Sequence, residues 1–162
     1  MNPPTGYNLR SAINADGEAV REVVFAALRE HGIEPSPEDT DLDLYAIEQH
    51  YAAIGGSFDV LVENQSDQIV GTVGLHPEAP GTVELRKMYL HAAHRGRGCG
   101  RYLLEHALAG ARQLGFSRVV LETTFKLPKA IAIYRACGFQ PYTATHCAPR
   151  CDLTMELYLN PP

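Results

Sequence analysis

Hydrophobic residues recur along the chain with two periods, one typical of helices and the other typical of strands. The first clear helical run lies between Asp16 and Gly32. Its apolar positions, spaced as on one helix face, are Val20, Val23, Val24, Ala27 and Leu28. Gly32 ends this run, and a loop rich in proline and acidic residues follows it. A weaker helical pattern covers residues 42–52, so we expect two helices in the first third of the chain.

Strand-like runs dominate the middle of the chain, and two further helical runs follow. The expected strands are residues 7–13, 57–64, 68–76, 81–91, 117–124 and 151–159. Short polar or Pro/Gly turns separate the runs between 57 and 91, which predicts an antiparallel meander. A third helix leads to Gly115. A fourth covers residues 127–138, with Pro128 in its first turn and Gly138 past its end.

This order of elements predicts a mixed α/β fold in one domain over residues 1–162. A central, mostly antiparallel mixed sheet of six to seven strands would carry helices on both faces. The strand–helix–strand unit at 81–124 should place its two strands side by side in parallel. The loop that opens its helix would then lie at the carboxyl end of the first strand.

Composition and charge narrow the classes of function. The chain has a formal charge of −5 at pH 7, which argues against a general nucleic-acid binder because nonspecific affinity depends on neutralising phosphates. No apolar run approaches a membrane span, and the first ten residues lack a signal-peptide pattern. The four cysteines are few and irregularly spaced, which is typical of reduced thiols. We therefore expect a cytoplasmic protein with no membrane or nucleic-acid partner.

The stretch "HRGRGCGRYLLEHAL" at residues 94–108 combines three alternating glycines with three arginines at a helix start. The first amides of a helix lack acceptors, and the helix dipole adds partial positive charge there. Glycines would let those amides approach an anion, so the stretch predicts a diphosphate site. The alternative is a flexible, solvated basic loop. The spacing fits neither GxxxxGK nor GxGxxG.

The run from Arg95 to Gly100 matches the R/Q-x-x-G-x-G/A signature of the GNAT superfamily of acyl-CoA-dependent N-acyltransferases. The flanking "VELRKMYLHAAH" and "LGFSRVVLET…KAIAIYRACGF" resemble that family in order and spacing. The resemblance implies the GNAT fold, with its parallel strand pair splayed at the cofactor cleft, and acetyl-CoA as co-substrate. It implies that loop amides hold the pyrophosphate and that a bulged strand pairs with the pantetheine arm. The loop residues are Arg95, Gly96, Arg97, Gly98, Cys99, Gly100 and Arg101, and the strand residues are Met88, Tyr89 and Leu90.

The implied reaction is direct attack by a primary amine on acetyl-CoA, with both substrates bound, and it calls for a base and an acid. Glu84 is the first candidate for the base, since it stands eleven residues before Arg95, an offset found for the catalytic glutamate in one branch of the family. Strand alternation places it on the face of Arg86, Met88 and Leu90. The alternatives are a plain ion pair for Glu84 and a catalytic Glu122.

Tyr134 is the candidate acid, because "AIAIY" matches a family pattern whose phenol lies near the sulfur of coenzyme A. Its alternative is a half-buried helix aromatic. Many members carry an asparagine seven positions earlier, where this chain has Leu127. We expect no metal, since His146, Cys147 and Cys151 lack a fourth ligand.

The acceptor is expected to be a small-molecule or peptide amine, bordered by residues 39–51 and 141–153. Asp41, Asp43 and Glu48 in the first of these segments are interpreted as a solvated acidic face, and the alternative is that they attract a cationic acceptor. The second segment is also placed where this family forms dimer contacts, which leaves a homodimer open. Two other functions compete with catalysis: a non-catalytic acyl-CoA sensor and a phosphate-binding interaction module.

Overall fold

Seven strands form one sheet at the centre of the molecule, described by a computed structural model for residues 2–159. The strands are β1 (Tyr7–Ser11), β2 (Ser57–Glu63), β3 (Gln68–Ala79), β4 (Thr82–Leu90), β5 (Arg118–Thr123), β6 (Gln140–Pro141) and β7 (Leu153–Tyr158). The helices are α1 (Gly17–Glu30), α2 (Ile47–His50), α3 (Cys99–Gln113) and α4 (Pro128–Ala136). Within the described residues, none of these helices combines the length and apolar character needed to cross a bilayer.

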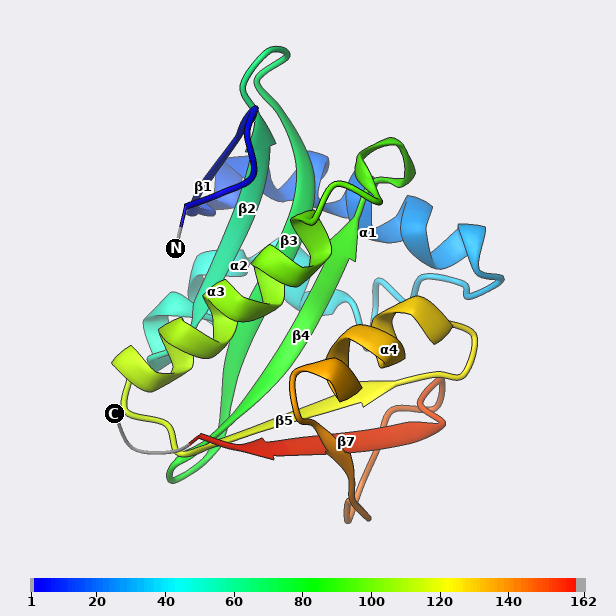
Figure 1. The fold of residues 1–162 in the computed structure, drawn as a ribbon. Helices are drawn as coiled ribbons and strands as arrows, with labels where there is room; N and C mark the ends of the chain where they lie inside the picture. The colour runs from blue at the N-terminus through cyan, green and yellow to red at the C-terminus, as the bar shows by residue number, and fades with distance from the viewer. Residues whose placement is uncertain (1, 160–162) are drawn as a thin grey trace.

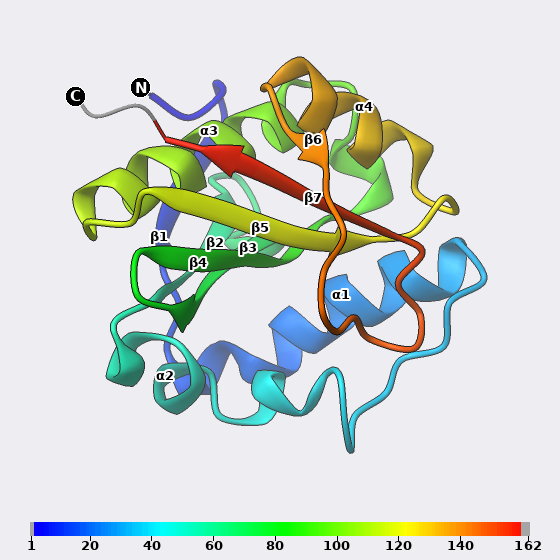
Figure 2. The same cartoon turned by 90° about the horizontal axis from the view of Figure 1, so that it is seen from below.

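The sheet order is β1-β2-β3-β4-β5-β7-β6, and β4 and β5 are its one parallel pair among the described strands. Figures 1 and 2 show α3 and α4 on one face of the sheet and α1 and α2 on the other. This confirms the expected mixed, mostly antiparallel sheet with helices on both faces. The predicted strand bounds agree with the observed ones to within a few residues.

Each face of the sheet has its own apolar core, because α1 and α3 both carry one buried stripe. On the α3 side, Leu103, Leu104 and Ala107 pack against inward residues of β3, β4 and β5. On the α1 side, Val20 and Leu28 pack among inward residues of β2 and the segment before it. The sheet is packed against an apolar core on each face, and this packing fixes the positions of its strands.

The prediction of one continuous helix over residues 42–52 is wrong. These residues form a 3₁₀ turn (Leu42–Tyr45), the single turn of α2, and another 3₁₀ turn (Ala52–Ile54). Ala46 interrupts the run with φ −151° and ψ 65°. Across this break the Tyr51 hydroxyl donates to the buried Asp43 carboxylate. Burial of Asp43 and its neighbours, which a helical pattern does not encode, holds the segment in this broken path.

The face expected for Glu84 is also partly wrong, because β4 carries a bulge. The register with β3 shifts between Thr72, which faces Tyr89, and Gly74, which faces Arg86. Lys87 lies in the bulge with φ 52°. An extra residue reverses the alternation beyond it.

Beyond the bulge, Met88 and Leu90 therefore pack with the α3-side core, together with Val83 and Leu85. They do not share the face of Glu84 and Arg86. The bulge itself was expected from the family resemblance. Its effect on the strand alternation was not included in the predicted face of Glu84.

Candidate active site

The site begins where the parallel pair comes apart. β4 and β5 pair from Thr82 with Arg118 to Leu85 with Leu121, and no further. β5 goes on pairing with β7 as far as Thr123, while β4 stays with β3 as far as Leu90. The two strands are thus drawn to different neighbours, and a wedge opens between them.

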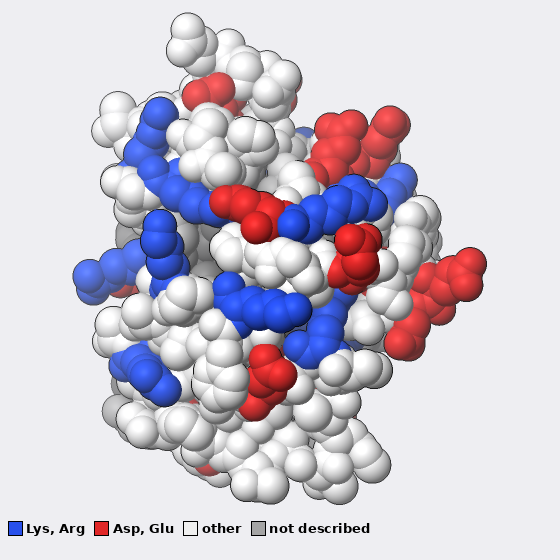
Figure 3. All heavy atoms as spheres, turned by 90° about the vertical axis from the view of Figure 1, so that its right-hand side faces the viewer, with Lys and Arg blue, Asp and Glu red and all other residues white. Residues whose placement is uncertain are grey.

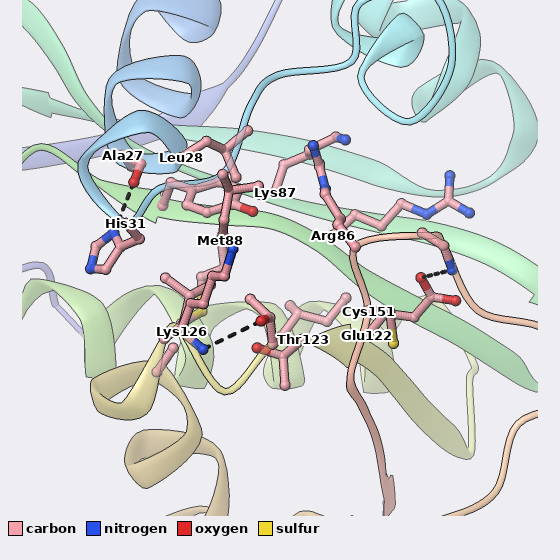
Figure 4. A pocket seen from close by; sticks show the side chains of 18 of the residues that line it. Ala27, Leu28, His31, Arg86, Lys87, Met88, Glu122, Thr123, Lys126 and Cys151 are labelled. Atoms are coloured by element: carbon pink, nitrogen blue, oxygen red, sulfur yellow. Dashed lines mark hydrogen bonds between the residues drawn. The ribbon is translucent and has the colours of Figure 1, made fainter.

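A cavity of about 1100 Å³ occupies this wedge and continues past both ends of it. Its glycine end contains Gly96, Gly98 and Gly100, and its carboxylate end contains Glu78, Glu84 and Glu122. Figure 4 shows the wall between these ends, with His31 and Lys126 on one side and Arg86 and Glu122 on the other. The volume exceeds that of a typical small-ligand pocket, so a long ligand arm and a second small molecule both have room.

The glycine end is built from the turn that starts α3. Gly96 and Gly98 have φ of 75° and 81°, and Gly98 caps the helix. A Cβ atom on either glycine would meet nothing within 4 Å, which leaves the backbone there open to a ligand. Positive φ and free amides together make a concave anion site, and this chemistry fits the diphosphate of coenzyme A.

The three arginines of the loop have different surroundings. Arg95 pairs with Glu30 at 2.7 Å and also donates to the Leu90 carbonyl, whereas the exposed Arg101 pairs with Glu105. Both line the cavity. Arg97 instead donates to the Tyr7 hydroxyl and is not among the lining residues. The Cys99 side chain lies in the core, and burial raises the pKa of its thiol.

Met88, Tyr89 and Leu90 all line the wedge, at the part of β4 that has left β5. Tyr89 packs toward the α1 side, and burial raises its pKa to about 12. Tyr134 approaches the same cavity from α4 with 7% of its surface exposed. Burial, with a smaller contribution from Tyr89, raises the pKa of its phenol. Among the described residues, no group forms a hydrogen bond with the Tyr134 hydroxyl.

The two candidate bases both lie at the carboxylate end. Glu84 accepts a hydrogen bond from Arg86 Nε at 2.5 Å, and Arg86 also donates to Glu78 at 2.9 Å. Burial raises the pKa of Glu84, and the Arg86 charge opposes this increase. Glu122 accepts from the backbone amide of Ala148 at 3.0 Å, and burial raises its pKa too (Figure 4). Two carboxyl groups with raised pKa values thus occupy the same end of the cavity.

A buried ionic cluster beside this end was missed by sequence reasoning. Asp41, with no exposed surface, binds Lys87 at 2.7 Å and Arg150 through both of its oxygens. Asp43 lies 3.4 Å from Lys87 and is also buried. The expected solvated acidic face at Asp41 and Asp43 is therefore wrong. No local pattern indicates these contacts, because the partners are 46 and 109 residues away from Asp41.

The remaining candidates from the sequence lie around the same cavity. Cys147 and Cys151 are free thiols in its lining, and Leu127 packs at the edge of the α1-side core. Within residues 2–159, no group of three or more His, Cys, Asp or Glu side chains is placed to hold a metal ion.

Comparisons with known proteins give matches to acetyltransferases. The family model described as "Acetyltransferase (GNAT) family" matches residues 22–139. An uncharacterized N-acetyltransferase of Escherichia coli K12, YjgM, is 33% identical over 142 residues, covering 85% of this chain and 84% of its own.

Two solved structures share the fold. An acetyltransferase of the GNAT family from Staphylococcus aureus Mu50 superposes with a TM-score of 0.88 at 22% identity, covering 95% of this chain and 99% of its own. The acetyltransferase yncA of Salmonella typhimurium, solved with its cofactor acetyl-CoA, gives a TM-score of 0.75 at 24% identity, covering 96% and 95%. At these sequence identities the structural similarity shows a shared fold alone.

The ionic cluster predicts an acid-sensitive contribution to stability. Burial alone would raise the pKa of Asp41, but hydrogen bonds from Arg150 and the charge of Lys87 outweigh it and lower the pKa to about 2. Because folding lowers this pKa from 3.8, the contribution is complete above about pH 4 and is lost as the pH falls through 2. It amounts to about 2 kcal/mol.

Urea unfolding of the wild type and Asp41→Asn at pH 5 and pH 2.5 measures this difference. The wild type should lose more of its unfolding free energy than the variant does over that range. Asp16→Asn, which removes a more exposed pair with Arg10, is the control. Its carboxyl pKa is also lowered, but solvent screens this pair, so the variant should differ from the wild type by less than Asp41→Asn does. Equal losses in the wild type and Asp41→Asn would contradict the assignment.

Proposed function

The chain belongs to the acetyltransferase (GNAT) family, and from this premise we propose that it transfers the acetyl group of acetyl-CoA to a primary amine. The observation that carries the proposal is the wedge between β4 and β5, with open glycine backbone at one end and buried carboxylates at the other. A thioester entering from the glycine end would reach the middle of the wedge. An amine entering from the carboxylate end would meet it there.

Residues of two kinds would hold acetyl-CoA. The amides of the loop from Arg95 to Arg101 would bind the diphosphate, and the β4 backbone at Met88, Tyr89 and Leu90, on the side that has left β5, would bind the pantetheine arm. When bound, acetyl-CoA supplies an activated acyl group and a thiolate leaving group. A β4 amide that points into the wedge would stabilise negative charge on the thioester oxygen.

The charges around the cavity agree with this orientation. The glycine end is rimmed by Arg95, Arg101, Lys126 and Lys129, which suits a ligand with several phosphate charges. Figure 3 views the side of the molecule with the loop before α4 and shows basic and acidic side chains interspersed there. At the carboxylate end, three glutamates outnumber Arg86, so a protonated amine is attracted before it loses its proton.

Removal of the amine proton is the larger of the two chemical demands. An amine with a pKa of about 10.4 is about 3.4 units from neutral at pH 7, or about 4.6 kcal/mol, whereas protonating a thiolate with a pKa near 8.5 needs about 2 kcal/mol. Glu84 would take the proton, directly or through water, because its raised pKa brings it closer to working pH. Tyr134, kept neutral by burial, would donate a hydrogen bond to the departing thiolate while keeping its own proton.

Binding of acetyl-CoA at the glycine end is tested by calorimetric titration of Gly98→Glu. Bulk and negative charge on this cap should weaken binding from micromolar strength by about a hundredfold or more. Gly115→Glu is a matched control at the other end of α3, since Gly115 also has positive φ (86°) and open space around it. The control should bind like the wild type. Failure of the wild type to bind would instead favour another acyl donor or a non-catalytic role.

The choice of base is tested by replacing each glutamate with glutamine. Glu84→Gln should lower kcat by about a hundredfold or more, the scale of general base catalysis. The raised pKa of Glu84 places the acidic limb of the wild-type kcat/KM profile above the pH of an ordinary glutamate, and this limb should vanish in the variant.

Coenzyme A release with a panel of amino acids, polyamines, aminoglycosides and lysine peptides gives the rates. Glu122→Gln is the comparison, and it should keep both kcat and the acidic limb. A larger loss in Glu122→Gln than in Glu84→Gln would transfer the role to Glu122.

Tyr134→Phe should separate catalysis from stability. The hydroxyl has no partner among the described residues, so its loss should leave the unfolding free energy nearly unchanged. Because the thiolate needs only about 2 kcal/mol of help, kcat should fall by at most about 30-fold. Tyr51→Phe loses the bond to Asp43. Urea should therefore unfold it with a lower free energy, while its rate of coenzyme A release should stay near that of the wild type. An unchanged kcat in Tyr134→Phe would remove the acid role.

A further inference from the structure

One carboxylate, Asp41, links three segments that meet at the carboxylate end of the cavity. Its own loop is tied to it by the Ser36 amide, which donates at 2.9 Å. Lys87, from the bulge of β4, donates to Oδ1 at 2.7 Å. Arg150 donates to Oδ1 and Oδ2 at 2.7 and 2.9 Å. Both oxygens are thus shared between groups that are distant in sequence and adjacent in space.

The link to Lys87 fixes the bulge. The lysine is in the left-handed region, where a residue other than glycine is uncommon and needs its surroundings to hold it. Its ammonium group is held by the Thr40 carbonyl at 2.6 Å as well as by Asp41. Its own carbonyl accepts from the Thr72 hydroxyl. Side chain and backbone are therefore both anchored at the residue that reverses the alternation of β4.

The link to Arg150 fixes the segment of residues 143–152, called here the acceptor loop. The loop is joined to β5 through Ala148, which donates to Glu122, and through Asp152, which donates to the Thr123 carbonyl. Arg150 is its link to the opposite wall, and a bidentate arginine–carboxylate pair defines direction as well as distance. The loop thus spans the cavity from β5 to Asp41.

We propose that Asp41 is a positioning residue for acetyl transfer, which sets the acceptor-facing wall by holding the β4 bulge and the acceptor loop in one arrangement. This proposal rests on the proposed function. The cluster of Asp41, Asp43, Lys87 and Arg150 has balanced formal charge, so the acceptor meets Glu78, Glu84 and Glu122 rather than Asp41. Attack depends on near-contact geometry, and small displacements of either wall reduce it.

The direct test removes one link and observes the others. In Arg150→Met, hydrogen exchange of amides in residues 36–43 and 143–152 should rise about tenfold or more, because the acceptor loop and the Asp41 loop lose their shared anchor. Arg118→Met is the matched control, since Arg118 likewise pairs with a carboxylate, Glu156 of β7, and has similar side-chain exposure (29% against 23%). It should leave both segments unchanged. Unchanged exchange of residues 36–43 in Arg150→Met would overturn the proposal.

Kinetics then distinguish positioning from general stability. With the panel amine that gives the fastest coenzyme A release, Arg150→Met should raise the amine KM about tenfold or more, while calorimetry shows an acetyl-CoA Kd within about twofold of the wild type. Arg150→Lys keeps the charge without the two-oxygen contact, so its amine KM should lie between those of the wild type and Arg150→Met. An equal loss of acetyl-CoA affinity would overturn the proposal.

Two further arms complete the test. Asp41→Asn, which weakens both links by removing the charge and one acceptor oxygen, should also raise exchange at residues 86–89. No change there would overturn the role at the bulge. If Arg150→Met fails to fold, Arg150→Lys carries the same expectations at smaller size. If no amine releases coenzyme A, the proposed function fails, while the exchange measurements still decide whether Asp41 couples the two walls.

Discussion

The site depends on one constraint: a parallel strand pair that cannot remain paired along its whole length. β5 is held by β7 and β4 by β3, so pairing between β4 and β5 ends after Leu85 and Leu121. Backbone groups along the separated part need other hydrogen-bonding partners. The wedge is therefore a place where a ligand with an extended, polar arm can complete a sheet. The glycine loop lies at its mouth because the helix that crosses back from β4 to β5 starts there.

The bulge makes this geometry specific and also costs free energy. A non-glycine residue in the left-handed region costs about 1–2 kcal/mol, and Lys87 adopts that conformation where it lines the cavity. Burying four charged groups would add to the cost if they were unpaired. The lowered pKa of Asp41 shows that the ionised carboxylate is favoured inside the protein despite its burial. The interactions that offset the cost of the bulge thus come from loops on the acceptor side.

Much of the fold follows from local sequence patterns, whereas the differences between the predicted and observed elements come from tertiary contacts. The continuous apolar runs of β2 and β3 and the buried stripes of α1 and α3 are visible in short windows of sequence. The glycines at 96 and 98 predicted an anion site because the open backbone that such a site needs follows from glycine itself. The broken segment at 42–54 and the reversed face at Met88 were not foreseeable in this way. Both depend on buried polar groups whose contacts no periodic pattern encodes: Asp43 accepts from Tyr51 inside the broken segment, and Lys87 is held by Thr40 and Asp41 from a distant loop.

The same contrast divides the site. The expected cofactor residues fall within one continuous stretch, from Met88 to Arg101, and are arranged by a strand, a turn and a helix start. The carboxylate end is formed by the loop of Asp41, by β4 and β5, and by the loop of Arg150. Its shape depends on how these segments are tied together, so no short motif describes it. Under the proposed function, substitutions in these loops should alter acceptor preference while the cofactor end keeps its sequence, because the two ends meet along β4 and are otherwise built from different segments.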